Sequence, residues 1–401
     1  MKRFYFPILF AYVLFTITNN RNAMGEVPFE SILIDGALPR AYQTAIADIN
    51  NDGRPDIAAV GEGGNSFAAW YENPSWKRRI ITSQETKNHI DFALYDLDGD
   101  GGLEMALASE FNLNDTAKGG IVSWLHRRPD IDAPWEVHPI HAEPTAHRLR
   151  WIDLDGDGRK ELINAPVAGK GASGPNFDQA PVRLLAYAIP SNLKESPWEM
   201  RTLDASLRLL HGLAIADFDR DEREDILTAS LEGVTVFCFF GKGKDNALQK
   251  RLVCAGKPAN GGRSGSSEVA LGKFRDGKPF LATIDPWHGN ELAVYIPVDS
   301  KEKEAWPRQR IDDSFVGGHA LACADFDGDG DDEIIAGYRG EGYAIYLYDF
   351  ADGDWKRSAV SHSVAVQGFA VGDVNGDGLS DFAAAGGTTN NVMLFLNRRK
   401  P

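Results

Sequence analysis

The feature that most constrains this chain is an acidic loop that recurs six times, each time with the same internal spacing. Positions 1, 3, 5 and 9 of every loop carry carboxylate or amide side chains, the oxygen ligands that a hard cation takes in proteins. The predicted metal ligands are Asp48, Asn50, Asp52 and Asp56; Asp96, Asp98, Asp100 and Glu104; Asp153, Asp155, Asp157 and Glu161; Asp217, Asp219, Asp221 and Asp225; Asp325, Asp327, Asp329 and Glu333; and Asp373, Asn375, Asp377 and Asp381. The sequence therefore predicts structural Ca²⁺ at five or six sites, the fourth loop being the weakest because Arg220 and Glu222 stand where other loops have glycine.

The loops differ from EF-hands. An EF-hand closes with a carboxylate at position 12 between helices, whereas these loops close at position 9 between short apolar runs such as residues 44–47 and 57–60. Runs of that length and composition are typical of β-strands. Asp-Gly pairs that only mark hairpin turns would explain one such loop, but not six with matching offsets.

The period of the repeat predicts the architecture. Neighbouring first aspartates are 48 to 64 residues apart, except for one gap of 108 between Asp217 and Asp325. Residues 268–282 fill that gap with a unit that keeps the strand pattern but has Gly272 where the first ligand should be. Seven units of this length match the blades of a β-propeller.

Each unit reads as four short strands, but the last unit ends after three of them, at residues 392–397. Residues 29–35 resemble the fourth strand of the first unit, residues 76–82, and are expected to complete the last blade. Such closure removes two sheet edges. We therefore predict an all-β fold, a seven-bladed β-propeller that occupies residues 25–401 as a single domain. A linear calcium solenoid is the alternative, although its repeats are far shorter.

The N-terminus predicts export. Two basic residues precede an apolar stretch at residues 4–17, which polar and small residues follow, so residues 1–24 have the pattern of a secretory signal peptide. The stretch is too short for a membrane span, and we expect a periplasmic or extracellular protein with no membrane span after cleavage.

Net charge and cysteines add little that is specific. The net charge of −16 includes 22 loop carboxylates (24 predicted ligands minus Asn50 and Asn375), and no basic cluster indicates nucleic acid. Cys238 and Cys254 are expected on neighbouring outer strands of the fourth blade, either bonded to each other or, like Cys323, as buried thiols.

A second set of residues recurs just upstream of each first aspartate, in most units six residues before it. The set is Gln43, His89, His147, His211, Ser266, His319 and Gln367. In a propeller these positions begin the innermost strands and meet at the central funnel, away from the acidic loops. The turns between second and third strands open on the same face and carry further polar residues: Glu62, Asn65, Glu110, Asn112, Lys170, Glu232, His288, Tyr338, Arg339 and residues 388–391.

The funnel residues admit two interpretations. A polar funnel lining satisfies itself with hydrogen bonds to neighbours and water, and repeated histidines can descend from one duplicated blade. A functional role is favoured for His288 and its neighbour Trp287, because the repeat explains neither residue.

Two resemblances follow from these motifs. The acidic loops resemble the FG-GAP, or VCBS, repeats of integrin α-chain propellers and many exported bacterial proteins, which implies the fold and calcium. The segments at residues 147–162, 210–214, 265–270, 285–291 and 318–321 resemble the propeller domain of aldos-2-ulose dehydratases, which eliminate water from keto-sugars.

This second resemblance implies an exported carbohydrate lyase or dehydratase that performs a β-elimination on a keto-sugar or 3-keto-glycoside. The implied catalytic residues are His147, His211, His288 and His319, with His89 as a fifth candidate, and the histidines are a candidate site for Zn²⁺ or another divalent metal. The substrate-binding candidates are Arg148, Lys170, Glu232, Trp287, Tyr338 and Arg339.

Two alternatives remain open at this point. One is a non-catalytic, calcium-stabilised propeller that binds glycan or protein. The other is a glycoside hydrolase or uronate lyase whose carboxylates are drawn from Glu62, Glu110 and Glu232. A ring of buried imidazoles favours the lyase, since an adhesion surface gains nothing evident from it.

Overall fold

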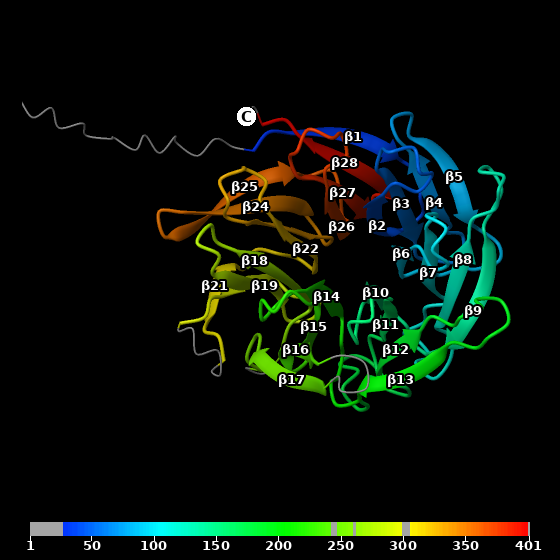
Figure 1. Ribbon diagram of the computed structural model, residues 1–401. Helices are drawn as coiled ribbons and strands as arrows, with labels where there is room; N and C mark the ends of the chain where they lie inside the picture. Colours follow the sequence, from blue (N-terminus) through cyan, green and yellow to red (C-terminus); the bar gives the residue numbers. More distant parts are fainter. Residues whose placement is uncertain (1–26, 242–246, 260–261, 299–304, 400–401) are drawn as a thin grey trace, which may run out of the picture.

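The computed structural model describes residues 27–241, 247–259, 262–298 and 305–399. These residues form seven four-stranded antiparallel sheets and no helix. The sheets stand around a common axis as the blades of a propeller, with the first strand of each blade innermost (Figure 1). The predicted all-β, seven-bladed propeller is confirmed.

Within blades 1 to 6 the strands follow chain order from the axis outward. Blade 1 contains β2 (Ala41–Ala47), β3 (Asp56–Gly61), β4 (Ala68–Glu72) and β5 (Lys77–Thr82). Blade 2 contains β6 (Asp91–Tyr95), β7 (Glu104–Ser109), β8 (Ile121–His126) and β9 (Glu136–Ala142). Blade 3 contains β10 (Arg148–Ile152), β11 (Glu161–Ala165), β12 (Leu184–Ala188) and β13 (Glu199–Asp204). Blade 4 contains β14 (Gly212–Ala216), β15 (Asp225–Ser230), β16 (Gly233–Phe240) and β17 (Ala247–Cys254).

The remaining blades repeat this order. Blade 5 contains β18 (Glu268–Lys273), β19 (Pro279–Asp285), β20 (Glu291–Tyr295) and β21 (Arg308–Asp312). Blade 6 contains β22 (Gly318–Ala324), β23 (Glu333–Tyr338), β24 (Ala344–Ala351) and β25 (Asp354–Ser361). Blade 7 contains β26 (Val366–Gly372), β27 (Asp381–Gly386) and β28 (Asn391–Asn397), with β1 (Phe29–Asp35) as its outermost strand.

The ring closes as the sequence predicts. β1 pairs antiparallel with β28, from Phe29 opposite Asn397 to Asp35 opposite Val392. The first and last strands of the described chain therefore share one sheet, and neither end of the blade array is left open.

The degenerate fifth unit is a complete blade. Gly272 lies in β18 opposite Phe280, and a β-carbon at this glycine would come within 2.2 Å of the Phe280 ring. Because Phe280 is fully buried, no side chain fits at this point. At the position where the other blades have the first aspartate of the acidic loop, blade 5 therefore has a glycine that makes room for the Phe280 ring.

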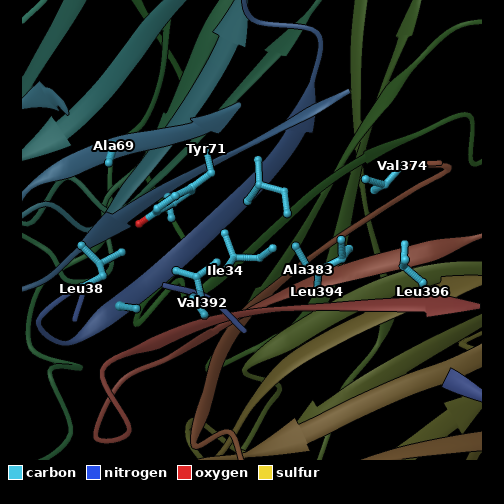
Figure 2. Packing of buried hydrophobic residues seen from close by; sticks show 13 residues of the cluster. Ile34, Leu38, Ala69, Tyr71, Val374, Ala383, Val392, Leu394 and Leu396 are labelled. Carbon is cyan, nitrogen blue, oxygen red and sulfur yellow. The ribbon is translucent and has the colours of Figure 1, made fainter. Parts of the chain in front are cut away.

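The hydrophobic core lies mainly between neighbouring blades. Figure 2 shows one such layer, in which Tyr71 and Ala69 of blade 1 approach Val392 and Leu394 of blade 7, with Ile34 of β1 between them.

Several other predictions concern the periphery. Residues 1–24, predicted as a signal peptide, lie outside the described residues. In the described part of the chain no helix is long and apolar enough to cross a membrane. Cys238, Cys254 and Cys323 are free thiols, and the first two do not face each other, since Cys238 lies opposite Gln249 and Cys254 opposite Val234.

Closure of the ring makes the packing of β1 a test of the fold. The Phe29 ring packs against Phe326 and Phe382, with centroids 5.8 Å and 5.2 Å away. We expect Phe29→Ala to lower the free energy of unfolding by about 2 kcal/mol, less than for a fully buried Phe because this ring is only partly buried. Leu33→Ala on the same strand is the matched control, because Leu33 is 59% exposed and its loss should cost under about 0.5 kcal/mol. Equal effects of the two variants in chemical denaturation would contradict this account of closure.

Candidate functional site

The site is built by irregularities at the start of the innermost strands. In β2, β22 and β26 the pairing with the next strand skips one residue, and the skipped residues are Tyr42, His319 and Gln367. A bulge of this kind leaves one residue out of the ladder and redirects its side chain. Here two of the three redirected side chains, Tyr42 and His319, meet at the funnel.

A strict spacing of six residues before the first aspartate identifies these positions. It selects Tyr42, Ile90, His147, His211, Ser266, His319 and Gln367. The predicted ring is therefore wrong by one residue in two blades, where Gln43 and His89 were chosen instead. A shift of one residue turns a strand side chain to the opposite face, which explains why neither residue reaches the cluster. Gln43 instead accepts a bond from the amide of Thr44, and His89 contacts the Thr86 hydroxyl at 2.8 Å.

Four histidines from four blades converge at the axis. His211 Nε2 lies 3.2 Å from His288 Nε2, and the ring centroid of His211 lies 4.9 Å from that of His319 and 4.7 Å from that of His147. The candidate ligand atoms of His211, His288 and His319 all lie within 4.8 Å of one another. The structure thus brings together the four histidines named first from the sequence, and leaves out His89.

Tyr42 connects two of these histidines across the funnel, a role that the sequence did not reveal. Its hydroxyl lies 3.2 Å from His147 Nε2 and 3.1 Å from His319 Nε2. His319 Nδ1 donates to the Gln367 carbonyl at 2.6 Å, so its Nε2 is the unprotonated nitrogen and accepts from Tyr42. The Tyr42 oxygen can then accept from His147 Nε2, which leaves His147 Nδ1 as a buried acceptor without a partner among the described residues.

The imidazole of His211 is oriented by a buried ion pair. Its Nδ1 donates to Glu268, 2.8 Å away, which leaves Nε2 unprotonated. The same Glu268 oxygen accepts from Arg148 at 2.9 Å, and the Arg148 guanidinium lies over the Tyr42 ring. Glu268 was not identified from the sequence, although it stands two residues after Ser266.

His288 has a different environment. Arg339 donates to its Nδ1 over 3.1 Å, so Nε2 carries the proton and donates to His211. A second Arg339 nitrogen donates to the Gln367 side chain over 2.7 Å. His288 therefore contacts both His211 and Arg339, and the Arg339 guanidinium takes no part in the ion pair between Arg148 and Glu268.

Burial keeps these imidazoles neutral at neutral pH. Burial, followed by the charge of Arg148 on His147 and of Arg339 on His319, holds the pKa of both well below the usual value. Burial likewise lowers the pKa of His211, although Glu268 opposes the shift. Burial also raises the pKa of the Tyr42 hydroxyl to about 12. The site therefore contains neutral nitrogen ligands and a protonated phenol.

A pocket of about 570 Å³ opens the cluster to solvent on the side of His288. It is lined by the β19–β20 turn of blade 5 and by the segments before and after that blade, including Lys257, Arg263, Trp287, His288 and Phe315. Trp287 packs edge-on against Phe177, which belongs to the long turn of blade 3. That turn thus crosses to the mouth of the funnel, where the Pro175 carbonyl accepts from Arg263 over 2.7 Å.

The other predicted substrate-binding residues lie apart from the cluster. Lys170 is exposed on the blade 3 turn, and Glu232 pairs with Arg208 on the rim. Tyr338 is turned toward the protein interior, where its hydroxyl donates to the Gly342 carbonyl over 2.6 Å and its ring stacks on Phe315.

The six acidic loops share one hydrogen-bond pattern at the other face. In each loop one oxygen of the position 9 carboxylate accepts from the backbone amide of position 2, as Asp56 does from Ile49 over 3.0 Å. The first aspartate accepts from the amide of position 6, as Asp48 does from Gly53 over 2.8 Å. The position 6 residue is in the left-handed region in every loop, including Glu222 at φ 69°, where a glycine would be free of strain.

The loop oxygens that remain unpaired fit a hard cation. Glu333 is 1% exposed and its Oε1 has no partner among the described residues, while burial raises its pKa to about 9. Within the second loop, and likewise within the third, carboxylate oxygens of the first three ligand positions lie within 4.8 Å of one another. In the fourth loop the Cys238 thiol lies beside Asp219 and Asp225, and in the second loop the His126 imidazole lies beside Asp98 and Glu104.

Comparison with known proteins agrees with this geometry. The family model described as "Aldos-2-ulose dehydratase, beta-propeller domain" matches residues 119–298, and that for an FG-GAP-like repeat matches residues 48–107 and 325–384. The chain resembles the propeller domain of aldos-2-ulose dehydratases. Aldos-2-ulose dehydratase of Phanerodontia chrysosporium is 23% identical over 351 residues, which cover 78% of this chain and 37% of the fungal protein. Integrin alpha pat-2 of Caenorhabditis briggsae is 27% identical over 269 residues, 61% of this chain and 18% of the integrin.

The match to the aldos-2-ulose dehydratase propeller includes three of the four clustered histidines. His147, His211 and His288 lie within residues 119–298, together with Glu268 and Arg263, whereas Tyr42 and His319 lie outside. Both predicted resemblances are confirmed, and the segment that carries the narrower one forms one side of the funnel.

The buried His89 provides a test of the electrostatics. Burial lowers its pKa to about 4, so the folded state binds the proton more weakly than the unfolded state, whose pKa is 6.5. The contribution of neutral, buried His89 to the free energy of unfolding is therefore fully present above pH 6.5. It decreases as the pH falls toward 4, by about 3 kcal/mol at most. We expect the difference in unfolding free energy between the wild type and His89→Gln to shrink over this window and to be constant above pH 7. A difference that does not change with pH would contradict the proposed burial.

Proposed function

We propose that this protein is an exported carbohydrate lyase that eliminates water or an alcohol from a keto-sugar or 3-keto-glycoside in the propeller funnel. The observation that supports this most is the convergence of four neutral imidazoles and one phenol, of which His288 lines a pocket of about 570 Å³. The similarity to the aldos-2-ulose dehydratase propeller supports the same reaction class.

The reaction needs a proton to move from a carbon next to the carbonyl to the departing oxygen. His147 Nδ1, buried and unprotonated, is the proposed base. As it takes the proton, its Nε2 proton can pass to Tyr42, 3.2 Å away, while the Tyr42 hydroxyl protonates the leaving oxygen. The C–H and C–O bonds break, a carbon–carbon double bond forms beside the carbonyl, and water or an alcohol leaves.

We further propose that His211, His288 and His319 hold Zn²⁺ or another divalent metal. The acceptors at Nδ1, Glu268 for His211 and the Gln367 carbonyl for His319, are the partners that orient metal-bound imidazoles. His288 supplies its unprotonated nitrogen once Arg339 releases it. When bound, such a cation polarises the ketone and stabilises the enolate.

The acidic loops are proposed to bind Ca²⁺ as structural ions. The repeated spacing and the unpaired, buried Glu333 oxygen support this, as does a compartment that a secretory signal at residues 1–24 would supply. Each ion would tie the first strand of a blade to its second.

The second candidate function is a non-catalytic propeller that binds glycan or protein, which the similarity to an integrin α chain favours. The carboxylates of a hydrolase or uronate lyase have less support. In the described structure Glu62 pairs with Arg40 and Glu232 with Arg208, each on its own part of the rim.

The lyase proposal predicts a chromophore. Purified protein incubated with 1,5-anhydrofructose or a 3-keto-glucoside, with and without Zn²⁺, should produce an enone that absorbs in the near ultraviolet. His147→Gln and Tyr42→Phe should each lower kcat by about 10² or more, because each removes a step of proton transfer. His362→Gln, a histidine on the outer surface, is the control and should retain activity. The absence of turnover with every keto-sugar, together with glycan binding, would favour the second candidate function.

The calcium proposal predicts a loss of stability on chelation. Removing Ca²⁺ should lower the melting temperature, since each site occupied at 100 times its dissociation constant contributes about 2.7 kcal/mol. Glu333→Gln should remove about one bound ion by elemental analysis, whereas Glu341→Gln, outside the loops, should remove none. A melting temperature that does not respond to chelator, with no metal in the purified protein, would overturn the proposal.

A further inference from the structure

The funnel mouth contains two guanidinium groups that have no carboxylate partner in the described part of the chain. Arg339 bonds only to neutral groups, the Gln367 side chain and the His288 ring. Arg263 lies over the Trp287 ring, 4.7 Å from its centroid, and donates to the Pro175 carbonyl. Among the described residues no ion pair therefore balances the charge of either group, and Arg263 lines the pocket.

The neighbouring cations differ in this respect. Arg148 is paired with Glu268, Lys257 with Glu291, and Arg40 with Glu62, each within 3.0 Å. In a chain with a net charge of −16, carboxylates are plentiful, yet no described carboxylate forms an ion pair with Arg339 or Arg263, and Glu62, which acts on Arg339 at longer range, is paired with Arg40. A partly buried cation without a counter-ion is costly unless a ligand supplies the charge.

The two guanidiniums flank the same histidine. Arg339 contacts His288 directly, and the Trp287 ring under Arg263 lies 4.6 Å from the His288 ring. Gly317, which lines the pocket, also accepts from the Arg339 backbone amide over 3.2 Å. Arg263 and His288 line this pocket, and Arg339 contacts His288, so a ligand that binds beside His288 lies close to both guanidiniums.

We propose that the sugar bound in this pocket carries an oxyanion, a carboxylate or a sulfate or phosphate ester, which Arg339 and Arg263 bind. The planar fork of donors in arginine matches such groups. Trp287, Phe315 and the prolines of the pocket provide the apolar surface on which a sugar ring packs. An oxyanion also gives Arg339 a stronger acceptor than the His288 ring, and so frees that imidazole nitrogen for the reaction.

This inference rests on the proposed function only in taking the ligand to be a sugar. It narrows the substrate from neutral keto-sugars to acidic ones. Arg263 lies within residues 119–298, which the dehydratase family model matches, whereas Arg339 lies outside them.

Calorimetric titration of the full-length, calcium-loaded protein tests the proposal with three probes of one size. D-glucuronate and D-glucose 6-sulfate present the two kinds of oxyanion, and D-glucose presents none. At least one of the anionic sugars should bind about tenfold or more tightly than glucose, and its affinity should fall as salt is added. The tighter of the two identifies the oxyanion. Equal affinity for all three sugars would overturn the proposal.

Variants identify the residues responsible. Arg339→Gln and Arg263→Gln should each weaken binding of the anionic sugar about tenfold or more while leaving the affinity for glucose unchanged. Arg339→Lys, which keeps the charge, should lose less. Arg310→Gln is the matched control, because Arg310 is exposed on β21 and pairs only with Asp313 at the surface. Unaltered binding of the anionic sugar in the folded Arg339→Gln variant would overturn the assignment.

The outcome separates this inference from the proposed function. Turnover of neutral keto-sugars without preference for an anionic sugar would leave the lyase and remove the oxyanion site. Selective binding of the anionic sugar without turnover of any keto-sugar would leave the site and remove the lyase.

Discussion

The pairing of β1 with β28 is the contact on which the rest of the structure depends. It joins segments from the two ends of the chain in one sheet and so fixes the number of blades at seven. With that number set, the seven innermost strands surround one axis, and residues far apart in sequence become neighbours. Tyr42 and His319, separated by 277 positions, meet only because the ring is closed.

The two faces of the propeller use repetition differently. On the acidic face the same loop recurs with the same hydrogen bonds, because the same residue types stand at the same spacing in each. On the funnel face the equivalent positions have diverged into tyrosine, isoleucine, histidine, serine and glutamine. Divergence at positions that share one backbone geometry is what turns a repeated scaffold into a single asymmetric site.

Electrostatics distinguishes the members of that site. Glu268 binds both His211 and Arg148, which fixes one imidazole tautomer and neutralises one guanidinium. Arg339 has no such partner among the described residues and instead holds His288 in the opposite tautomer. The cluster thus has two parts. In one, Glu268 pairs with His211 and Arg148; in the other, Arg339 contacts His288 beside the pocket without an ion pair among the described residues.

The sequence alone determined the fold, the strand that closes it and the six acidic loops, because each follows from a local pattern repeated many times. The sequence also identified all four histidines of the cluster. It failed at Gln43 and His89, where a hydrogen-bonding residue one position from the required spacing was preferred to Tyr42 and Ile90. Tyr42 and Glu268 owe their roles to contacts across the funnel, and the lack of a partner for Arg339 is a property of its surroundings. Only the tertiary structure decides such matters, since hydrogen bonds and unbalanced charge depend on which blades face one another, and no local pattern encodes that.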